Sequence, residues 1–172
     1  DDFFGETGPH GSMCLSLIAG LTDTYRGAAT KAQYYMMRSE EYLTESPKEL
    51  DNLVVAMEKA DSLGVNILSI SLGYAEFDNP NFNFTYADMN GRVSRASRAA
   101  TIAARKGILV CNAMGNEGNK DWKYLTAPAD ADSILSIGAV GVDSTIATFS
   151  SWGPSADGRV KPEACAVGYQ TV

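Results

Sequence analysis

The segment "PKELDNLVVAMEKADSLGVNILSISLG", residues 47–73, predicts a helix that leads directly into a buried strand. Pro47 suits a first helical turn and Gly64 suits the position just past a helix end. Between them, apolar side chains recur at helical spacing at Leu50, Leu53, Val54, Met57 and Ala60. The run from 65 to 71 is apolar and bounded by glycines, as in a strand covered on both faces. We therefore predict a helix over about 47–63 and a strand over 65–71.

The same alternation of helix and strand continues along the chain. "RVSRASRAATIAARKG", residues 92–107, predicts a second helix that stops at Gly107. Further buried strands are predicted at "ILVCNA" (108–113), "SILSIGAV" (133–140) and "AQYYMM" (32–37). From residue 145 onward, Gly-Pro, Asp-Gly and Lys-Pro pairs predict short strands and tight turns. Strands that alternate with helices indicate an α/β fold with a parallel sheet and crossover helices.

Composition limits the classes of protein to consider. A length of 172 residues, 45% apolar and 20% charged, suits one folded domain. The net charge of −7 argues against nucleic acid or an anionic membrane as the main partner. No apolar run approaches the 18 residues of a membrane span.

The cysteines and the histidine give little support for a metal site. Cys14, Cys111 and Cys165 are odd in number and lack CxxC spacing, so neither a disulfide framework nor a zinc site is predicted. We expect each to behave as a small buried apolar side chain. His10 is the only histidine, so a multi-histidine metal site is excluded.

Ligands of open parallel sheets gather beyond the carboxyl ends of the strands. The segments found there are "SLGY" (71–74) and "MGNEGN" (114–119), which contain glycine and almost no charge. Such segments let another backbone come close. Neither GxGxxG nor GxxxxGK[ST] occurs, so a phosphate site lacks support. Asn116 has two interpretations at this point: a plain turn residue, or an amide aimed at a ligand.

Four segments, taken in order, resemble the subtilisin-like serine proteases. They are "HGSMCLSLIAG" (10–20), "NILSISLG" (66–73), "ILVCNAMGNEGN" (108–119) and "ILSIGAVGVDSTIATFSSWGP" (134–154). The resemblance implies a three-layer αβα fold with a mainly parallel sheet. It also implies a serine endopeptidase that hydrolyses peptide bonds by Asp-His-Ser acyl transfer, with an extended polypeptide as substrate.

The resemblance assigns catalytic roles to His10 and Asn116. An imidazole accepts the serine proton and returns it to the leaving amine, because its pKa lies near neutrality. An uncharged amide donor stabilises the oxyanion without desolvating a second charge. The residues that the resemblance places along the substrate cleft are Ser71, Leu72 and Gly73 on one side and Ala113, Met114 and Gly115 on the other. Without the resemblance, His10 reads as an ordinary polar residue and 66–73 as a buried strand that ends at glycine.

The chain departs from the family pattern in two places. No Asp-Ser/Thr-Gly turn precedes His10, and no Gly-Thr-Ser triplet occurs before Val172. We expect residues 1–172 to be a fragment of a single peptidase domain, running from the His motif to before the nucleophile motif, and to be inert alone. Nearby serines, namely Ser12, Ser150, Ser151 and Ser155, are not expected to replace the nucleophile.

The wider expectations follow from the same resemblance. The parent protein is expected to be secreted or in the cell envelope, and bacterial. No cofactor is expected; structural calcium is common in the family, but no compact carboxylate loop places it here. An incomplete sheet predicts self-association of the chain. The alternative function is a subtilase-like module that binds peptides without catalysis.

Overall fold

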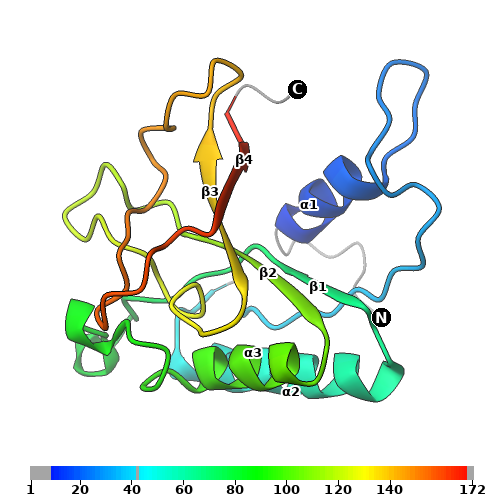
Figure 1. Cartoon of the computed structure of the whole chain (residues 1–172). Coiled ribbons are helices and arrows are strands. Elements are labelled where there is room, and N and C mark those ends of the chain that lie inside the picture. Colours follow the sequence, from blue (N-terminus) through cyan, green and yellow to red (C-terminus); the bar gives the residue numbers. More distant parts are fainter. Residues whose placement is uncertain (1–8, 42, 170–172) are drawn as a thin grey trace.

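The structure is a computed structural model that describes residues 9–41 and 43–169 (Figure 1). It forms one parallel sheet, with strands in the order β1-β2-β3-β4. In chain order the elements are α1 (His10–Ala19), α2 (Pro47–Leu63), β1 (Ile67–Ile70), the 3₁₀ helices η1 (Pro80–Phe82) and η2 (Tyr86–Asp88), α3 (Arg95–Arg105), β2 (Leu109–Ala113), β3 (Leu135–Val140) and β4 (Ala164–Val167). The predicted α/β class with a parallel sheet is confirmed.

Helix α2 has the bounds that its sequence predicts, because both of its ends carry local signals. At its start, the carboxylate of Glu49 accepts hydrogen bonds from the backbone N–H of Ser46 at 2.9 Å and of Glu41 at 2.8 Å. Glu49 is almost fully buried, so these donors replace lost water. At its end, Gly64 adopts a φ of 69°, the left-handed conformation that glycine accepts most readily.

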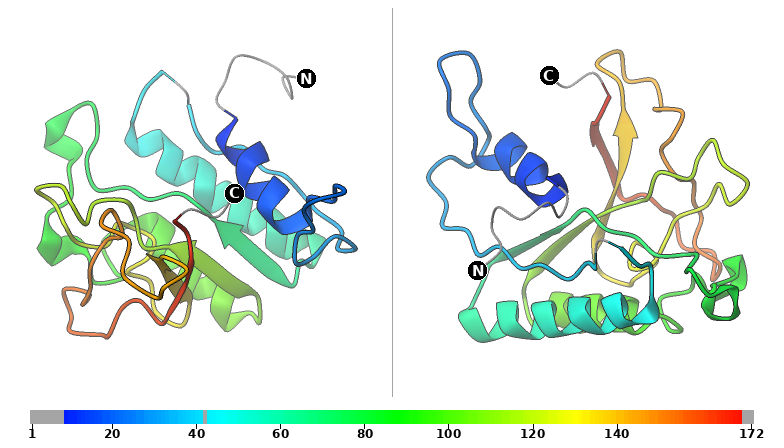
Figure 2. Two further views of the ribbon diagram at one scale, coloured as in Figure 1. Left: turned by 90° about the horizontal axis from the view of Figure 1, so that it is seen from above. Right: turned by 180° about the vertical axis from the view of Figure 1, so that it is seen from behind.

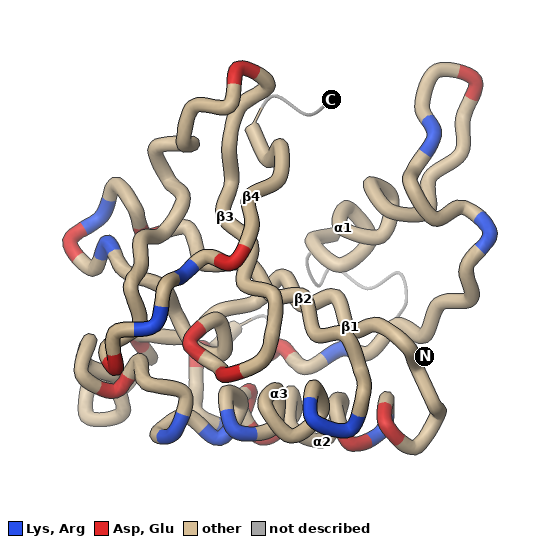
Figure 3. The backbone as a smooth tube through the Cα atoms, in the orientation of Figure 1, with Lys and Arg blue, Asp and Glu red and all other residues tan. Residues whose placement is uncertain are grey.

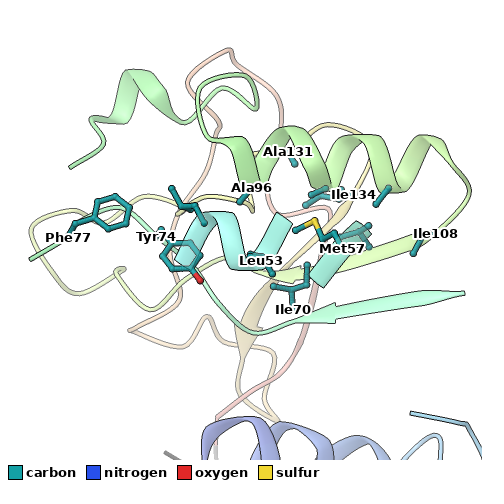
Figure 4. Packing of buried hydrophobic residues seen from close by; sticks show 13 residues of the cluster. Leu53, Met57, Ile70, Tyr74, Phe77, Ala96, Ile108, Ala131 and Ile134 are labelled. Atoms are coloured by element: carbon teal, nitrogen blue, oxygen red, sulfur yellow. The ribbon is translucent and has the colours of Figure 1, made fainter. Parts of the chain in front are cut away.

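The main core lies between the helix pair α2 and α3 and one face of the sheet (Figure 4). Leu53 and Met57 of α2 pack there with Ile70 at the end of β1. Helix α3 contributes the buried alanines Ala96 and Ala100, whose small side chains let the two helices approach closely. This layer fixes the positions of β1 and β2.

The opposite face of the sheet is only partly covered, which corrects the prediction of strands buried on both faces. Alternate residues point away from the α2–α3 layer, and among them Ile67 and Leu109 are 58% and 45% exposed. This face carries a groove of about 260 Å³, whose lining includes Ser69, Cys111, Ala113, Ile137, Ala139 and Ala166. The sequence pattern missed the asymmetry because exposed and buried positions in these strands are both apolar.

Helix α1 lies on this less covered side of the sheet (Figures 1 and 2). None of its residues is buried, and it contains no charged residue (Figure 3). The chain therefore has three layers, with α1 on one side of the sheet and α2 and α3 on the other. The layer on the first side consists of the single helix α1. Within the described residues, no helix is both long and apolar enough to span a bilayer.

Two further sequence predictions are wrong. The segment 32–37 is not a strand: Tyr35 and Met36 are each 48% exposed, and the fourth strand of the sheet is β4. An apolar run needs a partner strand, and in the described part of the chain this one has none. The cysteines are all free, but none is fully buried: Cys14 and Cys111 are half-buried, and Cys165 is exposed because every residue of the edge strand β4 is exposed.

Candidate active site

The carboxyl ends of β1 and β2 bring two of the predicted substrate segments side by side. Ile70 is in register with Asn112, so residues 71–73 and 113–115 leave the sheet together. The buried side chain of Asn112 donates through Nδ2 to the carbonyl of Ala113 at 2.7 Å and more weakly to that of Leu72 at 3.4 Å. This carboxamide therefore joins the two segments at the carboxyl ends of β1 and β2.

A third segment, residues 124–127, lies against the ends of both segments. Ala127 and Tyr74 exchange two backbone hydrogen bonds, of 2.8 and 3.0 Å. The N–H of Thr126 donates to the carbonyl of Met114 at 3.2 Å. The segment 124–127 thus bonds both to the residues that follow β1 and to those that follow β2, and it holds them at a fixed separation.

Asn116 sits on a turn that the segment 149–151 holds in place. Ser151 N donates to the carbonyl of Gly115 at 3.0 Å, and Ser151 Oγ accepts from Glu117 N at 3.0 Å. Gly115 has a φ of 109°, and a Cβ at Gly118 would lie 2.2 Å from the carbonyl oxygen of Ser150, so this turn requires glycine at both positions. Asn116 itself is exposed. Its carboxamide has no hydrogen-bond partner within 9–41 and 43–169, so it is available to a ligand.

His10 is the first residue of α1 and is exposed. Its Nε2 lies 3.6 Å from Sγ of Cys14, one helical turn further on. As far as the described residues go, no hydrogen bond joins His10 to Asn116 or to either edge segment. The structure therefore brings together the six predicted substrate residues and places Asn116 next to them, while His10 stands on a separate element.

Met114 differs from its expected role as a pocket wall. Its side chain is 1% exposed and packs with Met89, Leu125, Ala127 and Ala129 in a second buried cluster. Its bulk therefore supports the floor beneath the edge segments.

The nearby serines in "FSSWGPS" have structural roles. Ser150 and Ser151 are each 4% exposed and Ser155 is 1% exposed. Their hydroxyls hold the backbone of Ala139 and Glu117 and the carboxylate of Asp157, respectively. Ser12 is exposed on α1, two residues from His10. The structure therefore gives the three buried serines no access to a substrate.

Two buried polar groups anchor the loop that follows Thr126. Asp130 accepts hydrogen bonds from Ser97 Oγ and Gly91 N, and burial raises its pKa against the opposing effect of these donors. Lys161 Nζ donates to Ala131 O at 2.9 Å and to Ser136 Oγ at 3.1 Å, and pairs with Glu163 at 2.6 Å. Both groups are saturated with protein partners, so they support the loop and are not free for chemistry.

The described residues contain no group of three or more His, Cys, Asp or Glu side chains that would hold a metal ion. Cys111 lines the open groove, where burial raises the pKa of its thiol and keeps it protonated. The groups that the two segments present are their exposed backbone and the carboxamide of Asn116, while the imidazole of His10 lies on helix α1.

Comparison with known proteins shows the family of the chain. The profile of the Subtilase family matches residues 2–172, and the chain belongs to this family. It is 30% identical over 149 residues to the "Cuticle-degrading serine protease" of Arthrobotrys oligospora, covering 86% of this chain and 31% of that protein. It is 24% identical over 176 residues to "Subtilisin-like protease SBT6.1" of Arabidopsis thaliana, covering 98% of this chain and 15% of that one.

The fold is also shared with a solved structure. The crystal structure of MycP1 with its N-terminal propeptide removed superposes with a TM-score of 0.66 at 20% identity, covering 94% of this chain and 53% of that one. At this identity the likeness shows the fold alone. The chain thus spans 31% or less of the two relatives and about half of this structure.

Proposed function

We propose that this chain contributes the general base and the oxyanion donor of a subtilisin-like serine endopeptidase. The observation that carries the proposal is the exposed, unpartnered carboxamide of Asn116, held on a clamped turn beside two edge segments. A neutral donor fixed in this way is suited to a developing oxyanion, because it needs no reorganisation during the reaction.

In the proposed mechanism, a serine attacks the carbonyl carbon of the scissile peptide bond while His10 accepts its proton. The amide of Asn116 donates to the carbonyl oxygen as it becomes an anion. His10 then gives the proton to the leaving amine, and the acyl-enzyme is hydrolysed by the same steps with water as nucleophile. The mechanism also requires a nucleophilic serine and an aspartate that orients His10, and neither role is assigned to a residue of this chain.

The proposed substrate is an extended polypeptide. Ser71–Gly73 belong to no helix or strand and lie at the carboxyl end of the edge strand β1. An extended peptide pairs its main chain with such an edge and is recognised through its backbone more than its sequence. A protease of this kind acts outside the cytoplasm, in the medium or the cell envelope. It needs no cofactor, with structural calcium as the only ion the family suggests.

Labelling of the full-length gene product by a serine-directed fluorophosphonate tests the proposal. We expect stoichiometric labelling of the wild type and its loss in His10→Ala, because the unactivated hydroxyl is a weak nucleophile. Ser12→Ala changes an exposed residue of the same helix and should label normally. A folded wild type that does not label, but still binds extended peptides, would support the non-catalytic module instead.

A further inference from the structure

A second cavity, of about 370 Å³, lies where helices α2 and α3 begin. None of its described lining residues belongs to the segments 71–73, 113–115 or 124–127, so it is separate from the proposed substrate cleft. Sites for small molecules usually have volumes of about 300–1,000 Å³. This cavity therefore suits a compact ligand.

Much of the cavity wall is apolar and aromatic. Phe77, Phe82 and Phe84 come from the loop between β1 and α3, and the first turn of α2 also lines the cavity. The rings of Phe77 and Phe84 meet edge to face, with centroids 5.7 Å apart. Phe77 N donates to Asn83 Oδ1 at 2.7 Å, and Phe84 N donates to Ala75 O at 2.8 Å. This wall is therefore held in place and suits an apolar ligand group.

The start of α3 makes another part of the wall positively charged. The helix dipole places partial positive charge there, and α3 has neither a side-chain cap nor an acidic residue in its first turn. Arg95 and Arg98 add two guanidinium groups. Arg95 is paired with Asp51 at 2.8 Å, whereas the side chain of Arg98 has no hydrogen bond or ion pair within 9–41 and 43–169. Arg98 is therefore available to an anion.

Ser94, the residue just before α3, provides an independent indication of a ligand. It lines the cavity and is 2% exposed, yet its Oγ has no hydrogen-bond partner in the described part of the chain. A buried hydroxyl without a partner costs free energy, and a serine at this position normally bonds to the first N–H groups of the helix. Ser94 makes no such bond. An anion at the start of α3 would accept hydrogen bonds from this hydroxyl and from the N–H groups of the first turn.

We propose that this cavity binds a small apolar carboxylate, a compact aromatic or branched group that carries one carboxylate. The phenylalanine wall receives the apolar group, and the carboxylate accepts hydrogen bonds from Ser94 and Arg98. An inorganic anion or a neutral aromatic compound would use only one of these two parts of the wall. The inference goes beyond the proposed function, because no residue of the cavity has a role in the proposed mechanism.

The test measures binding of N-acetyl-phenylalanine to the full-length protein by isothermal titration calorimetry. N-acetyl-phenylalaninamide keeps the ring without the charge and acetate keeps the charge without the ring, so each should bind about tenfold more weakly or worse. Arg98→Gln removes a charged donor and should weaken binding of N-acetyl-phenylalanine by about tenfold, and Ser94→Ala by about threefold or more. Arg105→Gln, at the other end of α3, is the matched control and should bind as the wild type does.

Asn116→Ala tests whether the ligand binds in the substrate cleft instead. Unchanged affinity in Asn116→Ala together with lower affinity in Arg98→Gln would support the cavity, whereas the reverse would assign the ligand to the cleft and overturn the inference. Equal affinity for the amide and the carboxylate, or no binding of N-acetyl-phenylalanine to the folded protein, would also overturn it. None of these results bears on fluorophosphonate labelling, so failure of this inference leaves the protease proposal intact.

Discussion

Asn116 is the residue on which the chemistry depends, and its neighbour Asn119 offers a matched control in the same turn. We predict that Asn116→Ala lowers kcat of the full-length protein by about 10²–10³-fold, a magnitude carried over from a subtilase that lost one such donor. Asn119→Ala should leave kcat nearly unchanged. Equal losses in both variants, measured with one peptide substrate, would mean that the turn is only structural.

The contact between His10 Nε2 and Cys14 Sγ leads to a second prediction at the residue scale. Alkylation of Cys14 with iodoacetamide adds bulk beside the imidazole and should abolish activity. Cys14→Ala should be active and resist the reagent, although the exposed Cys165 is still modified. If Cys14→Ala is inactivated as fast as the wild type, another thiol is responsible.

At the scale of residues, the sequence predicted the candidate base and donor through motifs, but it gave no indication of Thr126. That residue lies in a loop, and only tertiary structure places its buried side chain between Gly73 and Gly115. Asn112 did leave a signal, since a polar residue interrupts the apolar run 108–113. Its partners Leu72 and Ala113 were not predictable from that signal.

At the scale of elements, the start of α2 depends on Glu49. Its buried carboxylate holds two backbone N–H groups, and charged hydrogen bonds of this type contribute about 1.5–3 kcal/mol. We predict that Glu49→Ala lowers the free energy of unfolding by about 2–3 kcal/mol in urea denaturation. Glu58→Ala, on the exposed face of the same helix, should change it by less than about 0.5 kcal/mol.

Glu45, just before α2, should make the stability of the fold depend on pH. Although the residue as a whole is exposed, partial burial of its carboxyl group raises its pKa from 4.5 to about 7, and the carboxylates of Glu49, Glu40 and Asp78 act in the same direction. A carboxyl group whose pKa is higher in the folded state stabilises the fold below pH 4.5, and this contribution is lost as the pH rises toward 7. Glu45→Gln should therefore lose less stability than the wild type between pH 5 and 7.5 in thermal unfolding, roughly the range set by these pKa values. A pH profile parallel to that of the wild type would contradict this.

The sequence predicts helix α2 closely but the segment 32–37 wrongly, because helices and strands depend on different kinds of contact. Helix ends are set by local groups such as Glu49 and Gly64, which are visible in the sequence. A strand is completed only by its neighbour, so an apolar run does not reveal whether a partner is present. The parallel pairing of β1 and β2 was predictable because helix α3 lies between them and makes the crossover.

At the scale of the whole molecule, the partly covered sheet face and the edge strand β1 leave apolar surface exposed. We predict that the 172-residue chain self-associates in dilute buffer, as measured by sedimentation velocity. The double variant Ile67→Thr and Leu109→Thr should shift the population toward monomer. Val142→Thr, at an exposed turn residue, should not, and a monodisperse wild-type monomer would contradict the prediction.

The central claim is that His10 and Asn116 flank one peptide carbonyl. The most direct measurement is a crystal structure of the full-length protein with a peptidyl aldehyde bound. We predict that the adduct oxygen lies within about 3 Å of Asn116 Nδ2 and that His10 lies within hydrogen-bond reach of the adduct. An adduct whose oxygen is bound elsewhere, or an imidazole of His10 that lies outside hydrogen-bond distance, would contradict it.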